Sequence, residues 1–145
     1  MNLNGIKTML MAVVVLMSQH GIADGLASSS REGASVYFIA PADGTQVETS
    51  FTVKFGLKGM GVAPAGTDKP DTGHHHLLID VDVLPDMASP LPANDKVKHF
   101  GKGQTETELS LSPGTHTLQL LLGNHLHVPH KPPLLSDKIT VTVVV

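Results

Sequence analysis

Two histidine pairs are the side chains in this sequence that are best suited to chemistry. His74 and His76 stand two residues apart. His125 and His127 repeat that spacing near the other end of the chain. Residues two apart in a β-strand share a face, which puts their imidazoles roughly 6.6 Å apart along the backbone. Two neutral imidazoles at that spacing can converge on one ion of copper, zinc, nickel or iron. The sequence therefore predicts a metal site, provided that the two pairs meet in space.

The predicted ligand set contains one further histidine, and three more residues are expected beside it. The predicted ligands are His74, His76, His125, His127 and His130. The residues expected to surround them are His75, His99 and Asp80. A carboxylate such as Asp80 would accept the second N–H of a ligating imidazole and so orient the ring. The chain has no cysteine, and the lack of thiolates favours copper(II) first and zinc second over copper(I).

Simpler interpretations of the histidines remain open. His75 and His116 each begin an otherwise apolar strand face, where a buried ring usually hydrogen-bonds to a backbone carbonyl. His130 lies between Pro129 and Lys131 in a predicted loop and could be solvated. Weak metal binding without a biological purpose would also explain a histidine-rich surface.

A pH-responsive binding module is the main alternative to a metal site. The chain has nine histidines and a net charge of -3 with histidine neutral. Histidine changes charge near its ordinary pKa of about 6.5, so mild acid would turn this chain positive. A protein partner or a small anion could then bind the histidine loops.

Catalysis is the third interpretation, and no catalytic residue is predicted. Copper-zinc superoxide dismutases also carry His-x-His pairs, which makes that activity the least unlikely one. However, this chain has no cysteine pair for the disulfide usual in that family, and its histidine spacing does not reproduce the ligand order. No serine lies in a nucleophile-elbow motif, and no Gly-rich phosphate loop precedes a helix.

Composition narrows the class of protein. The 145 residues favour one domain, and a hydrophobic fraction of 41% excludes a disordered chain. Sparse charge and few aromatic residues argue against a nucleic-acid partner. No protein partner is predicted from the sequence.

The N-terminal residues resemble a secretory signal. Lys7 precedes the apolar run Met9–Met17, which is too short to span a bilayer comfortably, and small residues surround Ala23. We therefore expect a signal peptide over residues 1–23, a flexible leader over 24–34 and one folded domain over 35–145. The expected location is the periplasm or the exterior, with no membrane contact after cleavage; an uncleaved anchor is the alternative.

Alternating apolar residues predict an all-β fold. Alternation or β-branched and aromatic residues indicate strands near residues 35–39, 51–58, 73–82, 105–111, 116–122 and 138–145. Turns rich in Gly and Pro separate them, and no amphipathic helix is found. The expected architecture is an immunoglobulin-like antiparallel β-sandwich of about seven strands. In the central segment, His75, Leu77, Ile79 and Val81 are expected to form an apolar face. His74, His76, Leu78, Asp80 and Asp82 are expected to form a polar face.

Four motifs together resemble a bacterial exported family that is known only as a domain of unknown function, DUF4399. The motifs are Gly73–Asp80, Phe100–Glu106, Pro113–Leu120 and Gly123–His130 with Pro132-Pro133 after it. The likeness runs from about Gly61 to Val145. Lys102 stands where the family usually has glycine, and Asn124 where aspartate is common, which removes a carboxylate beside the predicted site. The resemblance implies an exported, sandwich-like domain and implies no function.

Overall fold

The computed structural model describes residues 25–145, and this part of the chain contains nine β-strands. The strands are β1 (Ser35–Ala40), β2 (Thr45–Val47), β3 (Ser50–Lys58), β4 (Gly61–Val62), β5 (Thr72–Ile79), β6 (Val97–His99), β7 (Glu106–Ser110), β8 (Gly114–Gly123) and β9 (Ile139–Val143). The all-β prediction is confirmed, with nine strands instead of about seven. The predicted signal peptide over 1–23 lies outside the described residues. Among residues 25–145 there is no helix that could cross a membrane.

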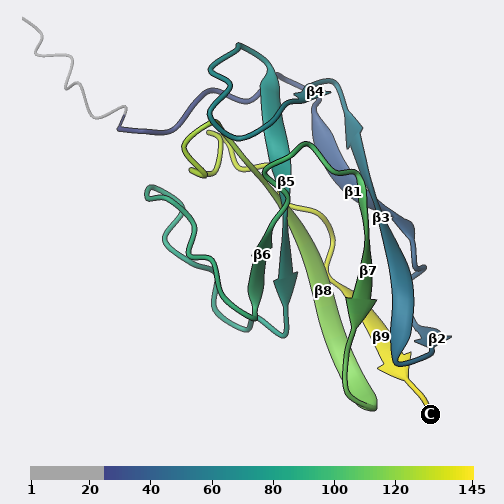
Figure 1. The fold of residues 1–145 in the computed structure, drawn as a ribbon. Helices are drawn as coiled ribbons and strands as arrows, with labels where there is room; N and C mark the ends of the chain where they lie inside the picture. The colour runs from purple at the N-terminus through teal and green to yellow at the C-terminus, as the bar shows by residue number, and fades with distance from the viewer. Residues whose placement is uncertain (1–24) are drawn as a thin grey trace, which may run out of the picture.

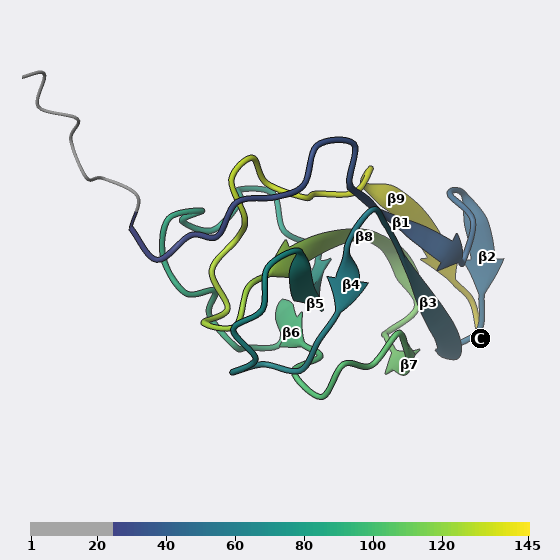
Figure 2. The same cartoon turned by 90° about the horizontal axis from the view of Figure 1, so that it is seen from above.

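The strands form two sheets (Figure 1). The smaller sheet has the order β1-β3-β7, and the larger has the order β2-β9-β8-β5-β4, with β6 added to β5. Most neighbours are antiparallel, whereas β2 pairs with β9, and β4 with β5, in parallel. Figure 2 shows the same arrangement from above, with the long β8 crossing the molecule beside β5. The immunoglobulin-like arrangement of these strands remains a prediction.

The main core joins residues from both sheets. Its buried members include Val53 and Phe55 of β3, together with Leu118, Leu120 and Leu122 of β8. These residues stand two apart in each strand, which is the alternation that the sequence predicted. Fully burying each such side chain contributes about 1.5–3 kcal/mol, so this core is the chief support of a domain without disulfides.

The second face of β5 is buried as well, which corrects the prediction of a polar face. Leu78 packs with Leu91, Val97 and Leu121 in a second apolar cluster. The long segment between β5 and β6 supplies Leu91, and β6 supplies Val97, so these elements cover β5. His74 and His76 lie on this covered face and are fully buried.

Val81 does not continue the apolar face of His75, as the sequence analysis had expected. The backbone of Asp80 is left-handed, with φ 52°, and β5 ends one residue earlier at Ile79. This turn breaks the alternation, and Val81 packs against the second cluster instead of the main core. Strict alternation therefore holds only as far as Ile79.

The segment that was expected to be a flexible leader is fastened to the C-terminal part of the domain. Ser30 donates its backbone N–H to the carbonyl of Lys131, and Lys131 donates its own to Ser28. Ser30 Oγ also donates to the Pro132 carbonyl, at 2.8 Å. Backbone pairing of this kind needs no apolar pattern, which is why composition alone suggested a mobile leader.

Candidate metal centre

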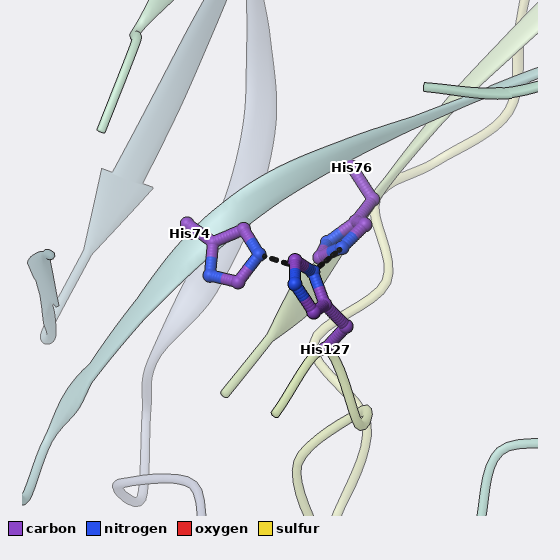
Figure 3. A group of neighbouring side chains, drawn as sticks. All are labelled: His74, His76 and His127. Carbon is purple, nitrogen blue, oxygen red and sulfur yellow. Dashed lines mark hydrogen bonds between the residues drawn. The ribbon is translucent and has the colours of Figure 1, made fainter. Parts of the chain in front are cut away.

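Three histidines from two elements converge on one point (Figure 3). His74 and His76 come from β5, and His127 comes from the loop after β8. The antiparallel register of β5 and β8 sets His74 opposite Gly123, so the loop that carries His127 starts beside the histidine strand. Nδ1 of His127 lies 2.9 Å from Nε2 of His74 and 3.3 Å from Nε2 of His76. One nitrogen from each ring lies within 4.8 Å of the other two.

Gly123 makes room for the His76 ring. A Cβ atom at position 123 would lie 2.5 Å from Cε1 and 3.0 Å from Nδ1 of His76. The first distance is shorter than Cβ atoms show to atoms that are not bonded to them, so a side chain at 123 would force the imidazole or the strand to move. The last residue of β8 thus has to be glycine for His76 to occupy this place.

Asn124 shapes the loop that presents His127. The Asn124 side-chain oxygen accepts hydrogen bonds from the backbone N–H groups of Leu126 and Val128. The backbone carbonyl of Asn124 accepts a further hydrogen bond from the backbone N–H of His127. The His127 backbone is left-handed, with φ 64°, a conformation that is uncommon outside glycine, although histidine adopts it more often than most residues. The hydrogen bonds to Asn124 hold the loop in a form that tolerates it.

The side-chain nitrogen of Asn124 binds the N-terminal segment of the described residues. Asn124 Nδ2 donates to the carbonyl of Leu26 at 2.7 Å and to Ser28 Oγ at 3.0 Å. An aspartate at 124 could accept the same loop N–H groups but could not donate. Asn124, in the place where aspartate is common, therefore adds two hydrogen bonds between the histidine loop and residues 26–28.

His99 lies against two of the three converging rings. Its ring centroid is 4.4 Å from that of His76 and 4.6 Å from that of His127. The pairing of β5 with β6 explains this position, because it sets His99 directly opposite His76. The His99 Nε2–H donates to the Pro92 carbonyl at 2.8 Å.

Two neighbouring residues of the long loop hold His99 and His127 relative to each other. Leu91 donates its backbone N–H to the His127 carbonyl at 2.9 Å, while the next residue, Pro92, accepts from the His99 ring. Leu91, Pro92 and Gly123 were not predicted as parts of the site from the sequence. Their contributions come from backbone atoms or from the lack of a side chain, which no pattern of chemical residue types reveals.

The convergence of the three rings is well suited to a cation. A neutral imidazole carries one N–H and one lone pair, so His127 Nδ1 can only accept from His74 and His76 or donate to one of them. Zinc–imidazole bonds of about 2.0–2.1 Å in a tetrahedral site put ligand nitrogens roughly 3.3 Å apart. The two separations from His127 Nδ1, 2.9 and 3.3 Å, are close to this value.

Burial keeps this group of rings neutral. Loss of solvation, together with repulsion from the neighbouring histidines, lowers the pKa of His74 to about 4 and that of His76 to about 2. Burial also lowers the pKa of His127. Metal ions bind the deprotonated ring, so these nitrogens are available as ligands at neutral pH.

Two predicted ligands lie elsewhere. His125 is partly exposed, and its Nδ1 faces Asp68 Oδ1 at 3.6 Å instead of the converging rings. His130 is buried and donates from Nε2 to the Thr72 carbonyl at 3.1 Å. The loop leaves the extended conformation after Gly123, so residues 125 and 127 do not share a face as they would in a strand.

Two residues expected around the metal also have other surroundings. His75 points into the main core beside Phe55, with ring centroids 5.2 Å apart, and neither of its nitrogens has a partner among the described residues. Asp80 orients a different imidazole, because its Oδ2 lies 2.7 Å from Nδ1 of His116. The left-handed turn at Asp80 carries the carboxylate away from His74 and His76.

Comparison with known proteins assigns the chain to a family. The model of the family described as "Domain of unknown function (DUF4399)" matches residues 53–144. The chain belongs to this family. The DUF4399 match contains His74, His76, His99 and His127, whereas residues 26–28, which hold Asn124, precede it. No curated protein and no solved structure matches the chain.

Proposed function

We propose that this chain is an exported metal-binding domain, with copper(II) as the preferred ion and zinc as the second choice. The proposed ligands are Nε2 of His74, Nε2 of His76 and Nδ1 of His127. The domain binds the ion and does not catalyse a reaction. One observation carries the proposal: three buried or half-buried imidazole nitrogens from separate parts of the chain point at one another.

The donor set supports copper(II) before zinc. Three imidazoles without a thiolate or a carboxylate suit either ion, and copper(II) binds a given nitrogen site more tightly than zinc. Zinc sites made of three histidines are also well established, and they leave a fourth position open. The lowered pKa values of His74 and His76 favour both ions, because protons compete weakly for the ligands at pH 7.

The same pKa values weaken the alternative of a switch in mild acid. A switch near pH 6.5 needs rings with an ordinary pKa. His74 and His76 stay neutral until the solution is far more acidic. A binding module that responds to mild acid would have to use histidines outside this group.

Titration of the metal-free domain with copper(II) and with zinc tests the proposal. The unaltered domain should bind one equivalent of copper(II) tightly, and the His76→Ala/His127→Ala double variant should bind none at the same concentration. The matched control is His125→Ala, which removes a histidine of the same loop that faces Asp68. Weak binding of several equivalents, or unchanged binding in the double variant, would refute the proposed site.

The export part of the proposal rests on the apolar run Met9–Met17 and the small residues around Ala23. The full chain expressed in a bacterium should be recovered from the periplasm, with a mature N-terminus at Asp24 by intact mass. Recovery from the cytoplasm at full length would refute export, and it would leave the metal site untouched.

A further inference from the structure

We propose that His99 is the fourth ligand of the metal site, binding through Nδ1, so that the bound ion is held by four imidazoles. This inference rests on the proposed function, because it completes the same site. It changes the expected chemistry, since four imidazoles complete a tetrahedral zinc shell or the equatorial plane of copper(II), whereas three imidazoles leave one of these positions open.

The position of His99 supports this assignment. β6 is three residues long and pairs with β5 so that His99 stands opposite His76. The His99 ring lies edge-on to His76, with an interplanar angle of 74°, and is tilted against His127 by 32°. His99 therefore lies beside His76, which comes from β5, and beside His127, which comes from the loop after β8.

The hydrogen bond to Pro92 makes Nδ1 the free ligand atom. Donation from Nε2 to the Pro92 carbonyl places the hydrogen on Nε2, so the lone pair is on Nδ1 in the neutral ring. Ligating histidines in proteins usually show this pattern, in which one nitrogen binds the metal and the other donates to a carbonyl or carboxylate. Among the described residues, Nδ1 of His74 and Nδ1 of His76 have no such acceptor.

A small movement is needed to bring His99 into the group. The nitrogens of His74, His76 and His127 form the set within 4.8 Å, and His99 is not a member of it. His99 is partly exposed, and it is the last residue of β6. The proposal therefore requires a change in the side-chain torsion angles of His99 that brings Nδ1 towards the other three nitrogens.

Loading the domain with one equivalent of copper(II) and counting coordinated imidazoles by pulsed electron paramagnetic resonance tests the assignment. The unaltered domain should show four imidazoles. The His99→Phe variant, which keeps a ring but has no nitrogen, should show three and bind copper(II) roughly 10-fold or more weakly. A His99→Gln variant, whose amide can still donate to Pro92, should also show three. His125→Ala should keep four and an unchanged affinity.

The outcomes separate this inference from the proposed function. One tightly bound copper(II) with three imidazoles, unchanged in both His99 variants, overturns the fourth ligand and leaves the three-histidine site standing. No tight binding by the unaltered domain overturns both. Thermal unfolding of each metal-free variant checks that lost binding does not come from lost folding.

Discussion

Nδ1 of His127 lies 2.9 Å from Nε2 of His74, although 53 residues separate them in the chain. Only the folded domain holds these nitrogens together, because the contact depends on the register of β5 and β8 and on the turn built by Asn124. An ion that binds them therefore binds the native state and not the unfolded one. Metal binding and folding are thermodynamically linked in such a domain.

Copper(II) should raise the thermal midpoint of the domain. An ion present at 100 times its dissociation constant adds about 2.7 kcal/mol to the free energy of unfolding. Differential scanning calorimetry with and without the ion measures the shift. His127→Ala should remove the shift, whereas His125→Ala should keep it; an equal shift in both variants would place the ion elsewhere.

Replacing Gly123 with alanine should lower both the stability of the domain and its affinity for copper(II). The new Cβ would lie 2.5 Å from the His76 ring, so either the ring or the strand must move, at a cost of about 1–3 kcal/mol. Denaturant unfolding and copper(II) titration should both show the loss. Gly61→Ala is the matched control in a strand, because its nearest atom would be 3.8 Å away. Unchanged copper(II) affinity in Gly123→Ala would mean that the position of the His76 ring does not matter for binding.

Replacing His75 with leucine should stabilise the metal-free domain. His75 is fully buried in the main core, and both of its nitrogens lack a partner among the described residues. Burying a polar group without a hydrogen bond costs roughly 1–3 kcal/mol, and leucine removes that cost. His116→Leu is a control with the opposite sign, since His116 bonds to Asp80 and to the Ser112 carbonyl. A His75→Leu domain that is less stable in urea would show that the ring has a partner in solution.

Stability of the metal-free domain should fall as the pH is lowered from about 6.5 towards 4. Burial lowers the pKa of His74 and His75 from 6.5 to about 4, and that of His76 further. The unfolded chain therefore binds more protons than the folded one in this interval, and each such histidine costs about 1.4 kcal/mol per pH unit. Urea unfolding at pH 7 and pH 5 with a chelator present measures the difference, and His75→Leu should reduce it. Equal stability at both values would contradict the burial of neutral rings.

The pair of His116 and Asp80 contributes to stability with a different dependence on pH. The hydrogen bond to Asp80 raises the pKa of His116, so its contribution is complete below 6.5 and is lost as the pH rises through the raised pKa. Burial raises the pKa of Asp80, but hydrogen bonds from His116 and Thr117 outweigh it and the net shift is downward. The Asp80 contribution is therefore present above 3.8 and is lost in strong acid. Because Asp80 and His116 are partly exposed, the effect is smaller than that of the buried rings.

The sequence predicted the six longer strands, and the shared face of His74 and His76, for a clear physical reason. Alternation in β3 and β8 reports which face is buried, and His74 and His76 share a face because they stand in a regular strand. The same rule failed for His125 and His127, since the chain turns at Asn124 and only His127 returns to β5. The strands β2, β4 and β6 have three, two and three residues, which is too short for any period to appear. The placement of His99 depended on one of these short strands.

Metal content is the most direct test of the central claim that His74, His76 and His127 form one metal site. The domain should be exported, purified without an affinity tag and analysed by elemental mass spectrometry beside His127→Ala. We predict one copper or zinc ion per chain in the unaltered protein and no stoichiometric metal in the variant. A domain that folds but carries only traces of transition metal, or a variant that carries as much as the unaltered protein, would contradict it.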